Sequence, residues 1–285
     1  MKTTFAPIPD IVADIPSLPV VATRILQIIA DEAASLLELK KVIALDQSFS
    51  ARLLRVANSP YYRAQKTISD ITDAIARIGL TTVQALIFAV SLRDLRRSAD
   101  RLDRMIWEHN LGVSVASQLV ARTAGFPGMA DIAVHGLLHD IGKVFLNLLD
   151  KHRYADVIEE VDNKEIPFFE AEQRVFGYDH ADMGRHVAKY WMLPEALVFT
   201  IANHHEPDLL DMKDAGLKRK ALVVKIADAI CSDAGIGLSR SGAPTDEEWQ
   251  YLKLQNPKKR AALADDIRRE YETYRDFVLG ARSKS

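Results

Sequence analysis

The chain has little cysteine and no excess of charge of either sign. Among its 285 residues Cys231 is the only cysteine, which excludes an internal disulfide and any zinc cluster built from several thiolates. Lysine and arginine total 37 against 39 aspartate and glutamate residues, so the net charge of −2 gives no general attraction for a polyanion such as nucleic acid. These absences indicate a reducing compartment and no strong nucleic-acid binding.

Features of exported and membrane proteins are also missing. Residues 1–19 contain four prolines and lack the apolar core of a secretory signal. The strongest apolar stretch, residues 83–92, is interrupted by Gln84 and is far shorter than the ~20 residues of a membrane-spanning helix. We therefore expect a cytoplasmic protein without a membrane partner.

Helical periodicity runs through most of the sequence. Apolar residues recur at spacings of three or four from Val21 to Ile29 and again from Leu263 to Val278, whereas sustained alternation with period two is missing. Capping, proline and glycine signals then divide the chain into many short helices. They predict helix boundaries at residues 35–38, 58–60, 79, 256–257 and 280. The pattern predicts an all-α fold of two packed helical subdomains.

Charge patterning suggests where these subdomains meet. The segment from Arg93 to Arg104 mixes both signs, which suits a solvated helix end or linker better than a nucleic-acid patch. We place the boundary near residue 100 and expect the polar segment 207–220 to be a loop over the second half. The predicted division is an N-terminal helical subdomain in 1–100, a metal-binding helical bundle in 101–235 and a C-terminal helical extension in 236–285.

Histidine and aspartate side chains recur in the second half, in helical contexts. An isolated histidine on an apolar helix is more often a hydrogen-bonded core residue than a ligand, but the whole set favours a metal site. Imidazole and carboxylate without thiolate suit divalent iron, manganese, cobalt or zinc. An aspartate beside a histidine can serve two metals, and paired metals favour phosphate-ester chemistry. The predicted ligands are His109, His139, Asp140, His180, His204, His205 and Asp228.

Helix geometry constrains these ligands. We expect residues 136–143 to be helical, which would place Lys143 one turn beyond His139, where its cation could face a phosphate. His204 and His205 differ by ~100° around a helix, so both can reach one cluster only near the end of that helix. Asn203 and the segment 206–207 predict such an end.

The remaining histidines carry weaker signals. His135 and His139 have the i, i+4 spacing of a zinc-protease helix, but leucine stands where that motif needs its glutamate base. His152 and His186 follow no usable spacing, and we interpret them as surface or structural residues.

The ligand series, with its segment His139-Asp140-Ile141-Gly142-Lys143, resembles the metal-dependent HD phosphohydrolase superfamily and its HD-GYP branch in particular. Leu18-Pro19, the run 46–62 and the segments 74–79 and 191–195 narrow the resemblance to the HDOD family, over about residues 15–235. HDOD proteins share the fold of HD-GYP phosphodiesterases but act as regulatory modules of bacterial signalling, and many lack the metal ligands.

The resemblance implies a two-metal site formed by the seven ligands. Iron or manganese would be the leading ions, with zinc, cobalt, nickel or magnesium as alternatives, and Asp140 and Lys143 would be catalytic if the site is active. Two features depart from HD-GYP enzymes. Residues 207–210 read Pro-Asp-Leu-Leu instead of the Gly-Tyr-Pro stretch, and Met105 stands where an acidic residue would support a third metal.

Two functions follow from these observations. The first is a bacterial HDOD-type signal-transduction module with a di-metal site and an unknown signalling protein as its partner. The second is a metal-dependent phosphohydrolase or phosphodiesterase acting on a nucleotide or another phosphate ester. The N-terminal half has no comparable cluster of ionisable residues, so we expect it to pack against the metal-binding half and present a surface to the partner.

Overall fold

The computed structural model describes residues 15–30, 36–44, 47–62, 67–92, 101–206 and 208–279, and all regular elements there are helices. The predicted all-α fold is confirmed. The first helices are α1 (Val20–Ala30), α2 (Leu36–Ala44), α3 (Gln47–Ala57), η2 (Pro60–Tyr62), α4 (Ile71–Ile78) and α5 (Leu80–Leu92). Then come α6 (Arg101–Ala124), α7 (Ile132–Leu138), α8 (Ile141–Leu149), α9 (Lys151–Lys164), α10 (Phe168–Phe176), α11 (His180–Tyr190) and α12 (Glu195–Asn203). The last are η4 (Leu209–Asp211), α13 (Ala215–Asp233), α14 (Asp246–Tyr251) and α15 (Pro257–Leu279).

Several predicted helix boundaries are confirmed by local hydrogen bonds. Helix α3 ends at Ala57, directly before the predicted break. Gly79 ends α4 with φ 97°, a backbone conformation that favours glycine, and its N–H donates to the carbonyl of Ile75. At the start of α15 the side chain of Asn256 accepts a hydrogen bond from the N–H of Lys258. The boundaries predicted at Ser35 and Gly280 lie outside the described residues.

Residues 208–220 differ from the loop predicted for 207–220, and Pro207 lies outside the described residues. Residues 208–220 contain η4, and α13 begins at Ala215. The side chain of Asp214 accepts hydrogen bonds from the N–H groups of Gly216 and Leu217, which caps the helix at this point. Lys218, Arg219 and Lys220 therefore belong to the first turns of α13.

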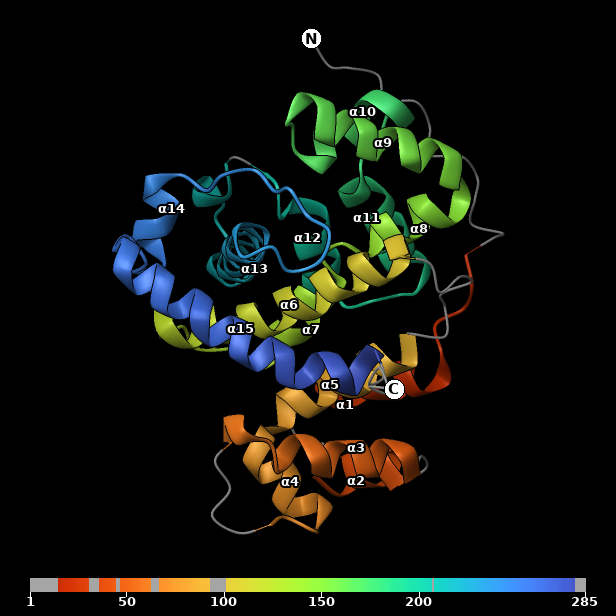
Figure 1. Ribbon diagram of the computed structural model, residues 1–285, viewed down its shortest axis with the longest axis vertical. Coiled ribbons are helices and arrows are strands. Elements are labelled where there is room, and N and C mark those ends of the chain that lie inside the picture. The colour runs from red at the N-terminus through yellow and green to blue at the C-terminus, as the bar shows by residue number, and fades with distance from the viewer. Residues whose placement is uncertain are drawn as a thin grey trace, which may run out of the picture.

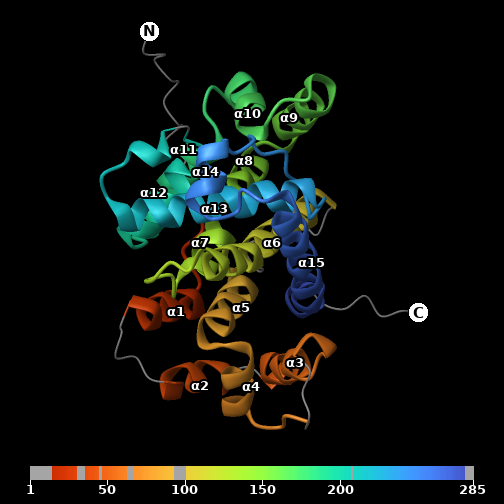
Figure 2. The same cartoon turned by 90° about the vertical axis from the view of Figure 1, so that its left-hand side faces the viewer.

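The helices share one elongated body (Figures 1 and 2). Helices α2, α3 and α4 lie at one end and the α9–α10 hairpin at the other, with α6, α7 and α13 between them. Helix α15 runs along the side and contacts both α6 and α3. One large hydrophobic cluster includes residues from Ile15 to Tyr274, so the two halves are packed together. The division at residues 100 and 235 stays a prediction.

One stretch of the described residues, Ile132–Leu149, is long and apolar enough to cross a membrane. It comprises α7 and α8, and 89% of it is buried inside the fold. Its apolar character is accounted for by its central place in the bundle. The expected cytoplasmic location stays a prediction.

Candidate metal centre

Helix ends bring five of the predicted ligands to one place. His139 and Asp140 lie at the junction between α7 and α8, where the backbone of Asp140 leaves the helical region with φ −101° and ψ 20°. The continuous helix predicted for residues 136–143 is therefore wrong. Because the chain turns at this junction, two adjacent side chains can face the same interior point, which successive residues of a straight helix cannot do.

The histidines of α11 and α12 are placed in the same way. His180 is the first residue of α11, and His204 and His205 directly follow the last residue of α12. The rings of His204 and His205 have centroids 4.0 Å apart, so the prediction that both lie at a helix end is confirmed. Helix α8 approaches α11 closely at Gly142, where a Cβ atom would lie 1.9 Å from the carbonyl oxygen of His180. Only glycine fits at that position.

The two remaining predicted ligands come from the middle of long helices. His109 lies on α6 and Asp228 on α13, and His109 Nε2 is 3.0 Å from Asp228 Oδ1. Both side chains are buried. Their proximity requires that α6 and α13 pack along each other, as they do.

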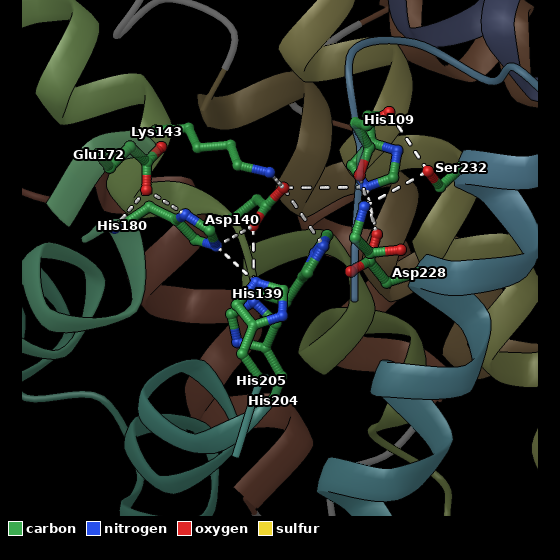
Figure 3. A network of polar contacts seen from close by, with 12 residues as sticks. His109, His139, Asp140, Lys143, Glu172, His180, His204, His205, Asp228 and Ser232 are labelled. Atoms are coloured by element: carbon green, nitrogen blue, oxygen red, sulfur yellow. Dashed lines mark hydrogen bonds and ion pairs between the residues drawn. The ribbon is translucent and has the colours of Figure 1, made fainter. Parts of the chain in front are cut away.

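The seven side chains form two adjoining groups (Figure 3). We call Asp140, His180, His204 and His205 the first ligand group, and His109, His139 and Asp228 the second ligand group. In each group every residue offers one nitrogen or oxygen atom, and these atoms lie within 4.8 Å of one another. Asp140 joins the groups, because its Oδ2 atom is 3.4 Å from His139 Nε2 and 3.8 Å from His109 Nε2. The structure thus brings all seven predicted ligands together.

Hydrogen bonds on the outer side of four histidines orient their rings. The Nδ1 atoms of His109, His139 and His204 lie 3.1, 2.8 and 2.9 Å from the backbone carbonyl oxygens of Ile236, Gly136 and Ile201. The Nδ1 atom of His180 lies 2.5 Å from Glu172 Oε2. In each case the Nε2 atom is directed toward the cluster. An imidazole held in this way presents a lone pair to a metal ion.

Unpaired buried atoms test whether a metal ion fits the cluster. Within the described part of the chain, His139 Nε2 and His204 Nε2 are buried and have no hydrogen-bond partner, whereas Asp140 Oδ1 lies 3.0 Å from His180 Nε2. A buried polar group without a partner costs roughly 1–3 kcal/mol, so two at one point require an explanation. Nitrogen and oxygen donors converging on one point, without thiolate, fit a divalent ion of the iron, manganese, cobalt or zinc type.

The pKa values of the cluster indicate which ligands can bind a metal ion without first losing a proton. Burial lowers the pKa of His139 to about 3 and that of His205 well below its usual range, so both rings are neutral near pH 7. Burial alone would raise the pKa of Asp228, but the hydrogen bond and charge of His109 outweigh it and lower this pKa to about 2. For His180 burial is outweighed by the carboxylates of Glu172 and Asp140, which raise its pKa to about 10, so this ring is protonated near pH 7 in the metal-free protein and must release a proton to bind a metal ion.

Lys143 completes the charge balance of the site. Its Nζ atom lies 2.5 Å from Asp140 Oδ2, and both side chains are buried. Burial would lower the pKa of Lys143, but the carboxylates of Asp140, Glu172 and Asp228 raise it, so the residue keeps its charge. Lys143 lies near the predicted metal ligands, but it belongs to α8, beyond the break at His139 and Asp140, and its partner in the structure is Asp140.

Sequence reasoning missed Glu172 of α10. Its Oε2 atom accepts hydrogen bonds from both the backbone N–H and Nδ1 of His180, and its Oε1 atom accepts one from the hydroxyl of Tyr154. A signal was present in the sequence, because Glu172 is four residues from Phe168 and from Phe176 and shares their apolar helix face. A glutamate on such a face needs a buried partner.

Three histidines are not part of the cluster. The ring of His135 lies 3.1 Å from Asp131 Oδ2 and 2.8 Å from the hydroxyl of Thr200, so it does not share a metal with His139. His152 and His186 are exposed, as their interpretation as surface residues requires.

Comparison with known proteins identifies the family. The sequence model of the HDOD domain family matches residues 15–207, more than half of the chain. The chain belongs to the HDOD family. The HDOD structure from Geobacter sulfurreducens, a protein of unknown function, is 29% identical, with a TM-score of 0.76 and 94% of each chain covered. This similarity extends the family's fold over nearly the whole chain.

Two solved structures of lower sequence identity share the fold. A structure from Shewanella amazonensis that is named as a phosphohydrolase is 22% identical, with a TM-score of 0.69. The match covers 97% of this chain and 98% of that one. A structure from Marinobacter aquaeolei that is named as a signal-transduction protein is 20% identical, with a TM-score of 0.73. The match covers 93% of this chain and 60% of that one. An uncharacterized protein of Treponema pallidum is 27% identical over 201 residues, which are 70% of this chain. The matched region is only 39% of that relative's length.

Proposed function

We propose that this HDOD protein is a regulatory module of signal transduction that binds two divalent metal ions, one at each ligand group, and acts through a signalling protein partner. The observation that carries the proposal is the common orientation of four buried histidines. Each has its Nδ1 atom held by a carbonyl or carboxylate and its Nε2 atom directed into the cluster. The nitrogen and oxygen donors suit iron, manganese, cobalt or zinc, and iron and manganese are the ions we expect first.

Burial of the site supports regulation rather than turnover. All ligands except His205 are buried, and His205 is half-buried. Helix α10 covers the cluster: the ring of Phe168 lies 4.9 Å from Lys143 Nζ, and the ring of Phe169 lies 4.9 Å from that of His205. Structural metal sites are closed in this way, whereas catalytic sites keep a position open for substrate.

Metal-dependent hydrolysis of a nucleotide or another phosphate ester is the second candidate. It is favoured by Lys143, a buried cation next to the shared carboxylate of Asp140. A bound pair of divalent ions would supply Lewis acidity and a more acidic water. Lys143 would then neutralise negative charge on a phosphate, and Asp140 would orient the site. For this function α10 would have to move, because Phe168 and Phe169 cover Lys143 and His205.

Metal content and turnover distinguish the two candidates. Protein purified without added metal is expected to retain close to two divalent ions per chain, and to leave a generic phosphodiester and cyclic dinucleotides unhydrolysed when manganese or iron is supplied. Retained metal with efficient turnover would instead support the hydrolase. A chain that takes up no metal would contradict both.

A matched pair of variants locates the metal. Asp140→Asn should lower metal affinity at both ligand groups by ~100-fold or more, because this carboxylate joins them. Asp131→Asn is the control, since Asp131 pairs with His135 outside the cluster. It should leave metal content unchanged. Circular dichroism should show near-normal helical content in both variants.

A further inference from the structure

A short segment after α13 lies against the second ligand group. We call residues 236–239 the strap. Their sequence is Ile-Gly-Leu-Ser, and they lie beyond residue 207, where the match to the HDOD model ends. The strap contacts both of the long helices that supply His109 and Asp228.

Two strap residues bind ligands of the second group directly. The carbonyl oxygen of Ile236 lies 3.1 Å from His109 Nδ1 and can accept its hydrogen. The hydroxyl of Ser239 donates to Asp228 Oδ1 at 3.1 Å, the same oxygen that faces His109 Nε2. The strap therefore fixes the ring of His109 from one side and the carboxylate of Asp228 from another. Such contacts set the direction in which each ligand presents its lone pair.

Backbone contacts hold the strap in place. The N–H of Leu238 donates to the carbonyl of Met105 on α6, and Ser232 Oγ of α13 donates to the carbonyl of Ser239. Figure 3 shows Ser232 beside His109 and Asp228. Gly237 has φ 70°, and a Cβ atom there would lie 2.3 Å from the backbone nitrogen of His109. The close approach of the strap to α6 thus requires glycine at this position.

The residue after the strap contacts helix α10, which covers the site. The carbonyl of Arg240, the next residue, accepts a hydrogen bond from the N–H of Phe168 at the start of α10. Helix α10 carries Glu172, which orients His180 of the first ligand group. One continuous segment therefore touches the second ligand group directly and the first through α10.

We infer that the strap is a positioning element for the metal ion of the second ligand group, with Ser239 and the carbonyl of Ile236 as its positioning groups. The inference rests on the proposed metal binding and adds that residues outside the HDOD match determine the affinity of one of the two metal positions. If Ser239 is replaced, Asp228 loses a hydrogen-bond donor that holds its carboxylate toward His109. The first ligand group would keep its own ligands and Glu172.

Cobalt(II) titration of the metal-free protein tests this inference. We expect the parent protein to bind two cobalt ions, followed by visible absorption and by calorimetry. Ser239→Ala should weaken one of the two binding events by ~10-fold and alter its visible spectrum, while the other event is unchanged. Ser241→Ala is the matched control, because Ser241 bonds to Ser232 through its backbone N–H. It should bind both ions as the parent does.

A glycine pair provides a second test that does not depend on the serine. Gly235 and Gly237 both have positive φ, but a Cβ atom at Gly235 would meet nothing within 4 Å. Gly237→Ala should weaken the same cobalt event as Ser239→Ala, and Gly235→Ala should leave both events intact. If Ser239→Ala and Gly237→Ala both bind two ions with parental affinity, the inference is wrong while metal binding stands. If the parent binds no cobalt, the proposed metal site itself is wrong.

Discussion

The two halves of this protein differ in what they bury. Among the described residues up to 92, the buried polar side chains are those of Thr82 and Gln84, neither of which titrates. The other buried polar or charged side chains all lie beyond residue 100 and include the histidines and aspartates of the cluster. An apolar interior is stabilised by burial alone, whereas a buried ionisable group costs free energy unless it is paired. The second half has therefore kept groups that stability alone would not favour.

The two halves should therefore respond to different perturbations. Loss of apolar volume should affect the stability of the N-terminal half without reaching the metal site. Protons and chelators should act on the second half, where the titratable interior lies.

Acid should destabilise the metal-free protein strongly. The pKa of His139, about 3, lies below its unfolded value of 6.5, so the unfolded chain takes up a proton that the folded chain excludes. Stability is therefore lost as pH falls from about 6.5 to about 3, and His205 acts in the same direction. Asp228 adds a further loss as pH falls from 3.8 to about 2, because its folded pKa is depressed.

His180 acts with the opposite sign. Its folded pKa of about 10 lies above the unfolded value, so its contribution is complete below pH 6.5 and is lost as pH rises toward 10. Urea unfolding of chelator-treated protein from pH 4 to 10 should therefore show maximal stability near neutrality. Hydrogen exchange at pH 5 should show the second half opening first. A free energy of unfolding that does not change between pH 7 and 4, or hydrogen exchange that shows α2–α4 opening first, would contradict this difference between the halves.

Loss of apolar volume in the N-terminal half should give the next largest effect. Leu53 is fully buried on α3, and Leu53→Ala is expected to lower the free energy of unfolding by about 2–5 kcal/mol. Leu54, its half-buried neighbour, is the matched control and should lose less on the same substitution. Urea unfolding measures the loss, and metal analysis of the folded fraction should give the parental metal content for both variants. A reduced metal content in folded Leu53→Ala would show that the two halves are not separable.

The smallest expected effect concerns one hydrogen bond at the first ligand group. Glu172→Gln replaces the carboxylate that faces His180 Nδ1 with an amide and should weaken metal binding at this group by ~10-fold. It should also reduce the alkaline loss of stability, because Glu172 raises the pKa of His180. Glu170→Gln on the exposed side of the same helix is the control and should change neither quantity. Calorimetric titration with manganese provides the measurement, and equal affinities for the two variants would remove Glu172 from the metal site.

Sequence reasoning reached the helices and the ligands for different reasons. Helix ends such as Ala57 and Gly79 follow from local signals, because proline, asparagine and glycine act on their own backbone. The ligand set was found because histidine and aspartate are unusual in apolar helices. The turn at Asp140 was missed, since the segment 136–143 contains no strong helix breaker except glycine and the turn depends on packing of α8 against α11.

Contacts made by the backbone could not be predicted from the sequence. The carbonyl of Ile236 reaches His109 across 127 positions, and any residue type would present the same carbonyl. Serine is common in loops, so the sequence does not single out Ser239. Its role is seen only from its hydrogen bond to Asp228 in the fold. Only the folded arrangement of α6, α13 and the strap shows these roles.

A crystal structure with anomalous scattering collected at the iron, manganese, cobalt and zinc edges would show whether each ligand group binds a metal ion. We expect two anomalous peaks ~3.5–4 Å apart, one bound by each ligand group, with Asp140 between them. The histidine Nε2 atoms should lie ~2.0–2.2 Å from the ions. Crystals of protein supplied with metal that show both ligand groups hydrogen-bonded only to each other, without an anomalous peak, would contradict this expectation.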